Sequence, residues 1–183
     1  MRVLFIAITG LALGALAHST AKAPAPLTLH ASGFSAGGLI PAKHTCDGAD
    51  RSPALSWSVP PNGTRSFVLI VDDPDAPDPA KPQRTWVHWV MYDLPAATRA
   101  LKEGVTTKTL PAGTREGLND WGATGWRGPC PPIGRHRYFF KLTALDTVLP
   151  ALPHADKAAV ETAMQGHVLA HGELIGLYQR PTK

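Results

Sequence analysis

Two proline-rich segments hold the side chains best suited to chemistry. Residues 73–77 read Asp-Pro-Asp-Ala-Pro, and residues 128–138 contain His136, Arg137 and Tyr138 after several prolines. Proline fixes φ and removes a backbone donor, so loops of this kind are stiff and hold their polar side chains in place. The two segments therefore predict a small polar site rather than a flexible linker.

Imidazole and carboxylate groups in and near these segments indicate anion binding. His88 lies in an aromatic-rich run and on its own would be a hydrogen-bonded core residue, but together with His136 it offers directed N–H donors to a phosphate oxygen. Asp73 could orient a histidine through its other nitrogen, or meet the ammonium end of an ethanolamine head group. Because neighbouring strand residues point to opposite faces, His136 and Tyr138 should share a face that excludes Arg137. We therefore expect Arg137 to be structural.

Metal binding is the first alternative for these residues. Calcium needs six to eight oxygens in a loop that can wrap the ion, whereas the acidic segment contains several prolines and no glycine. Two histidines and one aspartate could supply the three protein ligands of a catalytic zinc site, but nothing in their spacing favours zinc. We expect no metal and no cofactor. The acidic residues are Asp72, Asp73, Asp75 and Asp78.

A hydrolase is the second alternative, with Asp73, His88 and His136 as acid–base groups. Hydrolysis by a catalytic triad needs an activated serine, cysteine or threonine beside its base. Residues 33–37 match the letters of the G-x-S-x-G motif, but no helix is predicted after them, as a nucleophile elbow needs, and Cys130 lies between two prolines. We therefore expect a non-enzymatic binding protein.

The N-terminus has the form of a secretory signal peptide. Arg2 precedes an uncharged apolar stretch that ends in small residues, and the glycines within this stretch argue against a membrane span. We assign residues 1–23 to a signal peptide and leader, with the cleavage point left open between residues 17 and 23, and residues 27–183 to a single domain. No second hydrophobic span follows, so the mature chain should have no transmembrane segment. The expected location of the protein is exported, either periplasmic or secreted.

Charge and cysteine content narrow the class further. The formal net charge is +4, with 18 lysines and arginines against 14 acidic residues, and no basic cluster indicates nucleic-acid binding. Cys46 and Cys130 are the only cysteines, and an even pair in an exported protein is read first as a possible disulfide.

Periodicity predicts a β-rich domain with a small C-terminal helical element. A continuous apolar run at residues 66–71 fits a strand that is buried on both faces. After Asp156, a suitable N-cap, apolar residues recur at helical spacing up to Val168, and Gly166 could split this stretch into two short helices. Residues 111–136 are rich in glycine and proline and predict a long ordered loop. Strands are expected at residues 27–31, 54–59, 66–71, 85–94, 138–145 and 173–178.

Four sequence blocks, taken in order, resemble the phosphatidylethanolamine-binding protein family in its bacterial kinase-inhibitor-like branch. They are residues 34–57, residues 73–77 with Trp86-Val87-His88-Trp89, residues 128–138, and residues 166–180. The resemblance covers almost the whole mature chain. It departs at Trp126, which stands where a tyrosine is expected just before the third block.

This resemblance implies a mainly β fold, with two antiparallel sheets packed in a sandwich-like arrangement and short C-terminal helices beside a small anion pocket. It implies that the pocket is lined by Asp73, His88, His136 and Tyr138, with Pro77, Trp86, Gly128 and Pro129 forming its walls and mouth. Members of the family bind phosphate-type or phospholipid head groups, and some regulate kinases or proteases. The expected ligand is therefore a phosphate-type anion or a phospholipid head group, and a protein partner is left open. A secreted protease or kinase inhibitor has the same fold and is not separated from a binding protein by sequence.

Two further predictions concern the surroundings of the pocket: whether the two cysteines are bonded, and whether one peptide bond is cis. Cys46 and Cys130 belong to blocks that should lie beside it, and export supplies oxidising conditions, so we predict a disulfide between them. We also predict a cis bond between Asp73 and Pro74, which would let Asp73 leave its strand sharply.

Overall fold

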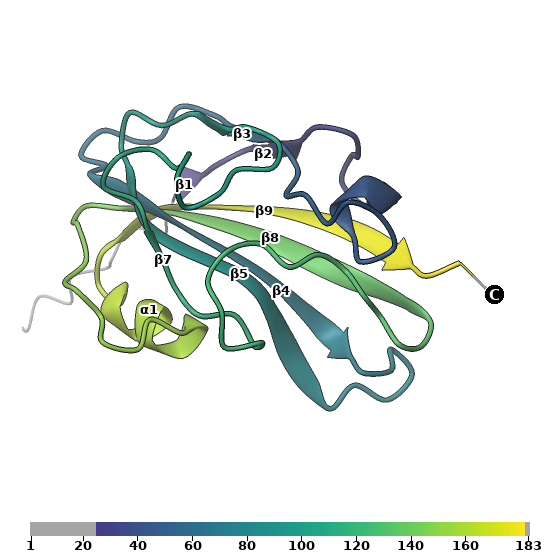
Figure 1. Cartoon of the computed structure of the whole chain (residues 1–183). Helices are drawn as coiled ribbons and strands as arrows, with labels where there is room; N and C mark the ends of the chain where they lie inside the picture. The colour runs from purple at the N-terminus through teal and green to yellow at the C-terminus, as the bar shows by residue number, and fades with distance from the viewer. Residues whose placement is uncertain (1–24, 182–183) are drawn as a thin grey trace, which may run out of the picture.

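Two β-sheets, one α-helix and one 3-10 helix make up the part of the chain that this computed structural model describes, residues 25–181 (Figure 1). The signal peptide and leader expected at residues 1–23 lie outside the described residues. The helices are η1, a 3-10 helix at Ala42–His44, and α1 at Lys157–Ala163. The larger sheet contains, in spatial order, β1 (Ala25–Pro26), β9 (Val168–Gln179), β8 (Arg135–Leu145), β4 (Ser66–Ala76), β5 (Arg84–Pro95) and β7 (Arg115–Glu116). The smaller sheet contains β2 (Leu29–Ala31), β3 (Leu55–Trp57) and β6 (Ala100–Leu101).

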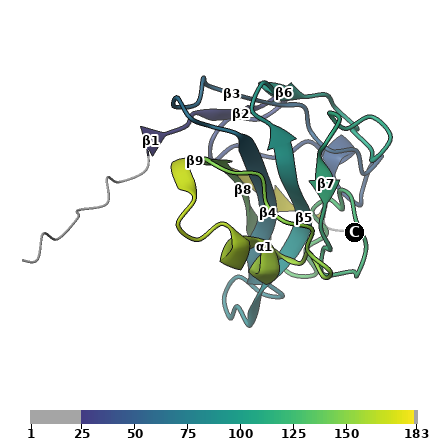
Figure 2. The same ribbon diagram turned by 90° about the vertical axis from the view of Figure 1, so that its left-hand side faces the viewer.

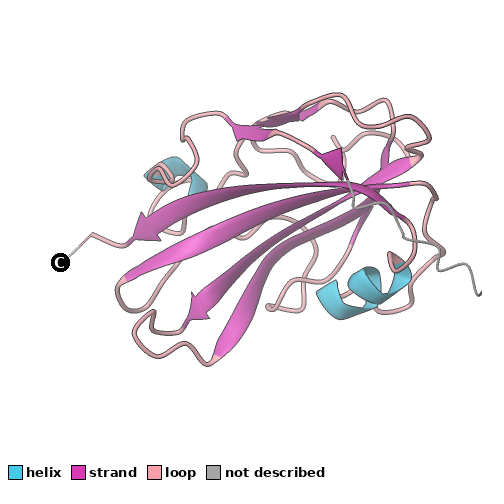
Figure 3. Cartoon of the chain, turned by 180° about the vertical axis from the view of Figure 1, so that it is seen from behind, coloured by secondary structure: helices cyan, strands magenta, loops and turns pink. Residues whose placement is uncertain are grey.

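Four strands of 11 or 12 residues make up most of the larger sheet. Figure 3 shows this sheet from behind. β5, β4, β8 and β9 pair with one another in antiparallel order, and the two-residue β1 runs parallel to β9 at one edge. β2, β3 and β6 are antiparallel as well. The predicted fold class, mainly β with two antiparallel sheets in a sandwich-like arrangement, is confirmed.

The core is divided between the two faces of the larger sheet. Alternate residues of β4 point to opposite faces, so Phe67 packs toward the small sheet, where its ring lies 5.6 Å from that of Trp57. Ile70, from the other set, belongs to a second cluster with Val160 of α1. Figure 2 shows the small sheet and α1 on opposite sides of the larger sheet. The apolar run at residues 66–71 is therefore buried on both faces, as the sequence predicts.

The C-terminal region differs from the expected pair of short helices. α1 ends at Ala163, Gly166 lies in a turn with φ +81°, and Val168 begins β9 instead of continuing a helix. Burial alternates along β9, which is the period of a strand, and this pattern explains why the chain leaves the helical spacing. Within the described residues, no helix is long and apolar enough to cross a membrane.

The first proline-rich segment is a strand rather than a loop. β4 continues through Asp73, Pro74 and Asp75 to Ala76, with an irregularity in its pairing to β5 between Asp73 and Ala76. The predicted cis bond at Asp73–Pro74 is wrong, because the extended backbone needs no sharp turn there. The cis bond of this segment is Ala76–Pro77, where β4 ends.

We predict that Asp156→Ala lowers the free energy of unfolding by about 1 kcal/mol. The Asp156 carboxylate accepts a 2.8 Å hydrogen bond from the Ala159 N–H, and without it a donor at the first turn of α1 loses its partner. Urea unfolding would measure the change. Glu161→Ala is the matched control, because it removes an exposed carboxylate from the same helix and should cost less than about 0.5 kcal/mol. Equal losses in the two variants would contradict the cap.

Candidate functional site

A pocket of about 270 Å³ lies where β4 ends and where β5 and β8 begin. Six of the residues expected from the sequence line it: Asp73, Pro77, Trp86, His88, His136 and Tyr138. The remaining lining residues are Ala76, Trp121, Cys130, Pro131 and Pro132. Gly128 and Pro129 stand behind the wall instead of lining the pocket. Pro131 and Pro132 follow the predicted residues directly, whereas nothing in the aperiodic segment around Trp121 marked it as a pocket residue.

Asp73 and His136 form a buried pair in the lining of the pocket. The side chain of His136 is fully buried, and its Nδ1 lies 2.7 Å from Oδ2 of Asp73, so the carboxylate orients the ring as the sequence suggests. The ring's Nε2 lies 2.9 Å from the carbonyl oxygen of Ile133. Both ring nitrogens therefore face acceptors, and only the doubly protonated imidazolium donates to both. His136 thus has no N–H left for a ligand, which corrects the expectation that it donates directly to a phosphate.

The second aspartate of the segment fastens β4 to β8. Asp75 accepts from the backbone N–H of Arg137 at 2.9 Å and from the Arg137 guanidinium at 2.6 Å. The Arg137 guanidinium lowers the pKa of the Asp75 carboxyl more than burial raises it. Arg137 is half exposed, whereas His136 and Tyr138 are buried on the other face, so the predicted strand alternation and the structural role of Arg137 are confirmed.

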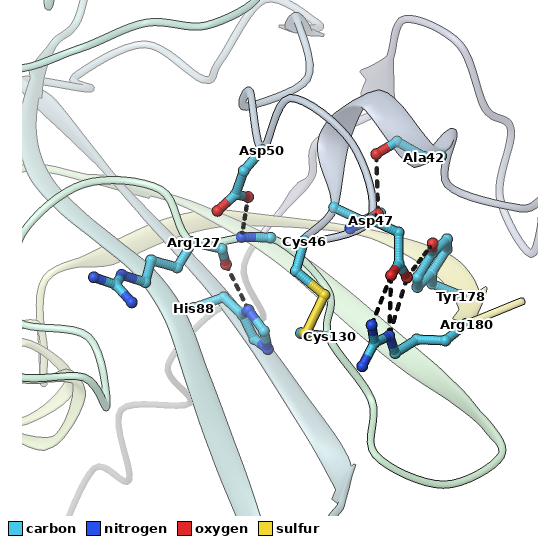
Figure 4. The surroundings of a disulfide bond; sticks show 11 residues. Ala42, Cys46, Asp47, Asp50, His88, Arg127, Cys130, Tyr178 and Arg180 are labelled. Atoms are coloured by element: carbon cyan, nitrogen blue, oxygen red, sulfur yellow. Dashed lines mark hydrogen bonds and ion pairs between the residues drawn. A yellow bond between two sulfur atoms is a disulfide. The ribbon is translucent and has the colours of Figure 1, made fainter. Parts of the chain in front are cut away.

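His88 presents a nitrogen without a protein partner in the described part of the chain. Its Nδ1 lies 2.6 Å from the carbonyl oxygen of Arg127, as Figure 4 shows, so Nδ1 carries the hydrogen. Burial lowers the pKa of the His88 imidazole, and this outweighs the opposite effects of the Arg127 carbonyl and of the Asp73, Asp50 and Asp72 carboxylates. The imidazole is therefore neutral near pH 7, and its Nε2 is a hydrogen-bond acceptor.

Two further polar groups of the pocket residues lack partners among the described residues. The Tyr138 hydroxyl is buried, and burial, together with the nearby charges of Asp73 and Asp75, raises its pKa far above the usual range. It therefore keeps its hydrogen at every physiological pH. The indole Nε1 of Trp86 is also buried without a partner. An unpaired buried polar group is costly, so both groups favour a ligand that bonds to them.

Arginines and aromatic rings surround the pocket. The Arg84 guanidinium lies 4.3 Å from the ring centroid of Trp86 and pairs with Asp120 at 3.0 Å. The Arg127 guanidinium lies 5.6 Å from the ring centroid of Trp121 and has no ion pair with another described residue. Two arginines therefore lie near the pocket, and one of them is paired with a carboxylate.

A disulfide and a close backbone contact hold in place the part of the pocket wall that is formed by residues 130–132. Cys46 is bonded to Cys130 (Figure 4). The Cys46 N–H donates to the Pro129 carbonyl at 3.1 Å. Gly128 donates to Oδ1 of Asp50 at 2.7 Å. A Cβ at Gly128 would stand 2.1 Å from the carbonyl oxygen of His44, so only glycine fits there. The wall formed by Cys130 and the two following prolines is thus fixed from behind.

The lining residues show what chemistry the pocket can do. Within residues 25–181, no group of three or more histidine, cysteine, aspartate or glutamate side chains is arranged to hold a metal ion. The lining includes no serine or threonine, and its one cysteine is in the disulfide. Trp126 does not line the pocket. Its ring stacks on Phe140 at 5.9 Å, so the departure noted in the sequence falls in the core.

We predict that the double variant Cys46→Ser, Cys130→Ser loses about 4 kcal/mol of unfolding free energy, less whatever structure persists in the unfolded chain. The bond closes a sequence separation of 84 residues, and both side chains are exposed, so the substitution leaves no core cavity. Urea unfolding of the wild type with and without dithiothreitol should show the same difference. The variant, as control, should not respond to dithiothreitol. A wild-type midpoint that is unchanged by full reduction would contradict the prediction.

Comparison with known proteins identifies the family. A family model described as phosphatidylethanolamine-binding protein matches residues 30–179. A UPF0098 protein of Methanothermobacter thermautotrophicus is 48% identical over 155 residues, which cover 84% of this chain and 99% of that relative.

Two solved structures share the fold at substantial identity. A phosphatidylethanolamine-binding protein homologue from Chlamydia trachomatis is 38% identical, with a TM-score of 0.77, covering 85% of this chain and 99% of its own. YbcL of E. coli is 32% identical, with a TM-score of 0.77, and the match covers 86% of this chain and 100% of YbcL. The chain therefore belongs to the phosphatidylethanolamine-binding protein family.

Proposed function

We propose that this chain is an exported, non-enzymatic binding protein whose pocket holds the phosphate group of a small molecule or a lipid head group. The observation that carries the proposal is a set of unpartnered hydrogen-bonding groups among the residues of one pocket: Nε2 of His88, the Tyr138 hydroxyl and Nε1 of Trp86. A volume of about 270 Å³ suits a head group rather than a large ligand. The unpaired Arg127 guanidinium near Trp121 adds a favourable charge for an anion.

Binding without catalysis is supported by the state of the ionisable groups. His136 is engaged at both nitrogens, and each oxygen of Asp73 already accepts a hydrogen bond, from His136 and from the Asp75 N–H. The pocket offers no hydroxyl or thiol nucleophile apart from the phenol of Tyr138, whose raised pKa makes it a poor one. Export is supported by the signal-type N-terminus and by the disulfide, which persists in oxidising compartments.

Tyr138→Phe separates binding from folding. The hydroxyl has no protein partner in the described residues, so its removal should leave the melting temperature unchanged or slightly higher. If it donates to a phosphate oxygen, phosphoethanolamine binding should weaken about tenfold. Calorimetry on the mature wild type and the variant would measure both affinities.

Tyr92→Phe is the matched control, because Tyr92 is buried in the cluster on the α1 side of the sheet and does not line the pocket. Its affinity for phosphoethanolamine should equal that of the wild type. Wild-type affinity in the Tyr138 variant would overturn the site. Steady hydrolysis of p-nitrophenyl phosphate or p-nitrophenyl acetate by the wild type, lost in the Tyr138 or His88 variants, would overturn the non-enzymatic assignment.

A further inference from the structure

The hydrogen-bonding pattern of the pocket distinguishes between oxyanions of the same charge. A phosphomonoester with one hydrogen and a sulfate monoester both carry one negative charge on a tetrahedral group. The phosphate form has an O–H donor as well as acceptor oxygens, whereas the sulfate has acceptors alone. A site that combines donors with a fixed acceptor would therefore separate the two.

His88 supplies that fixed acceptor. The 2.6 Å contact between Nδ1 and the Arg127 carbonyl holds a hydrogen on Nδ1, and burial of the ring, which is 3% exposed, favours its neutral form, so the lone pair lies on Nε2. The ring cannot turn over without losing this bond, and it is wedged between two aromatic rings, with centroids 5.2 Å from those of Trp121 and Tyr138. A ligand oxygen that carries no hydrogen would place its lone pair against the lone pair of Nε2, and the two acceptors would repel each other.

The ionisable groups around His88 do not change this assignment. On β4 its neighbours include the carboxylates of Asp73 and Asp72, and Asp50 contributes a third from the loop before β3. These three charges favour a protonated ring, but burial opposes it more strongly. On β8, Tyr138 is neutral, and the charge of His136 is balanced by Asp73.

The remaining polar groups suit the other oxygens of the same ligand. The Tyr138 hydroxyl and the Trp86 indole N–H can each donate to an oxygen that carries no hydrogen. His136 cannot, because Ile133 and Asp73 already accept its two hydrogens. The pocket residues thus offer one acceptor and two donors, which matches one P–O–H and two P–O oxygens.

We propose that the pocket binds phosphomonoesters in the form that still carries a hydrogen, with P–O–H donating to Nε2 of His88, and that it rejects sulfate esters of the same charge and shape. This proposal rests on the proposed function, since it names the ionic form of the ligand at the same site. It makes His88 a specificity-determining residue and Tyr138 a contributor to affinity alone.

Phosphoethanolamine and ethanolamine O-sulfate form a matched pair of probes. At pH 6, where about half of a phosphomonoester keeps its hydrogen, the phosphate should bind the wild type about ten- to a hundredfold more tightly than the sulfate. Between pH 7 and pH 8 the affinity for phosphoethanolamine should fall by close to tenfold, because the hydrogen-bearing form falls by that factor above a pKa of about 6. The sulfate should bind weakly throughout this range.

Variants separate the roles of the two residues. In His88→Gln the side-chain amide can donate as well as accept, so the preference for phosphate over sulfate should fall toward one. Tyr138→Phe should weaken both probes by a similar factor and keep their ratio. Melting temperatures would show whether each variant is folded. If the His88 variant does not fold, the comparison of the two probes on the wild type still tests the proposal.

The outcomes distinguish this proposal from the function on which it rests. Equal affinity of the wild type for both probes, or sulfate binding with uptake of a proton in calorimetry, would overturn the proposal and leave a phosphate-type anion pocket. Binding of neither probe would overturn the proposed function as well. Ethanolamine alone binding as tightly as phosphoethanolamine would overturn both, because the ammonium group would then be the part recognised.

Discussion

Backbone pairing between β4 and β8 ends at Asp72 and Phe139, just before Asp73 and Pro74, and the pocket is built where this pairing stops. Proline has no N–H to give to a neighbouring strand, so the ladder cannot continue unchanged through Pro74. From Asp73 onward, two carboxylates link β4 to β8 in place of backbone hydrogen bonds. Asp73 is bonded to the His136 side chain, and Asp75 accepts from the backbone N–H of Arg137. The strands therefore stay attached while the space between their ends becomes available for lining side chains.

The replacement of backbone pairing by carboxylate hydrogen bonds places ionisable side chains in the interior. How these side chains pair determines which polar groups the pocket leaves free. A buried carboxylate without a partner is strongly unfavourable, so Asp73 and His136 depend on each other. Because their charges cancel and the His136 nitrogens are used within the protein, the pocket interior is close to neutral. The polar groups that the fold leaves free are then an imidazole nitrogen, a phenol and an indole. Under the proposed function, specificity would come from which hydrogens are present rather than from net charge.

Local sequence patterns predicted most of the fold because burial follows simple periods here. The apolar run at residues 66–71 and the aromatic-rich run at residues 85–94 both became long strands of the sheet. The prolines of the Asp-Pro-Asp segment predict a loop where the structure has a strand, because the carboxylates that replace the backbone pairing have partners that are distant in the sequence. The spacing up to Val168 predicts a helix, whereas Val168 begins β9, since a few apolar residues at i, i+4 and i+8 fit one face of a strand equally well.

The pocket residues were foreseeable by type, whereas their hydrogen-bonding roles were not. Side-chain chemistry pointed to Asp73, His88, His136 and Tyr138, but backbone carbonyls decide what the two histidines can do, and a sequence does not show where a carbonyl lies. The Ile133 carbonyl occupies the second ring nitrogen of His136, and the Arg127 carbonyl holds the hydrogen of neutral His88 on Nδ1, which leaves Nε2 as an acceptor. Both carbonyls belong to the loop segment that Gly128 and the disulfide hold against the sheet. The strands thus fix where the imidazoles lie, while the loop fixes which of their nitrogens carry hydrogen, so a change in the loop could alter ligand choice without altering the core.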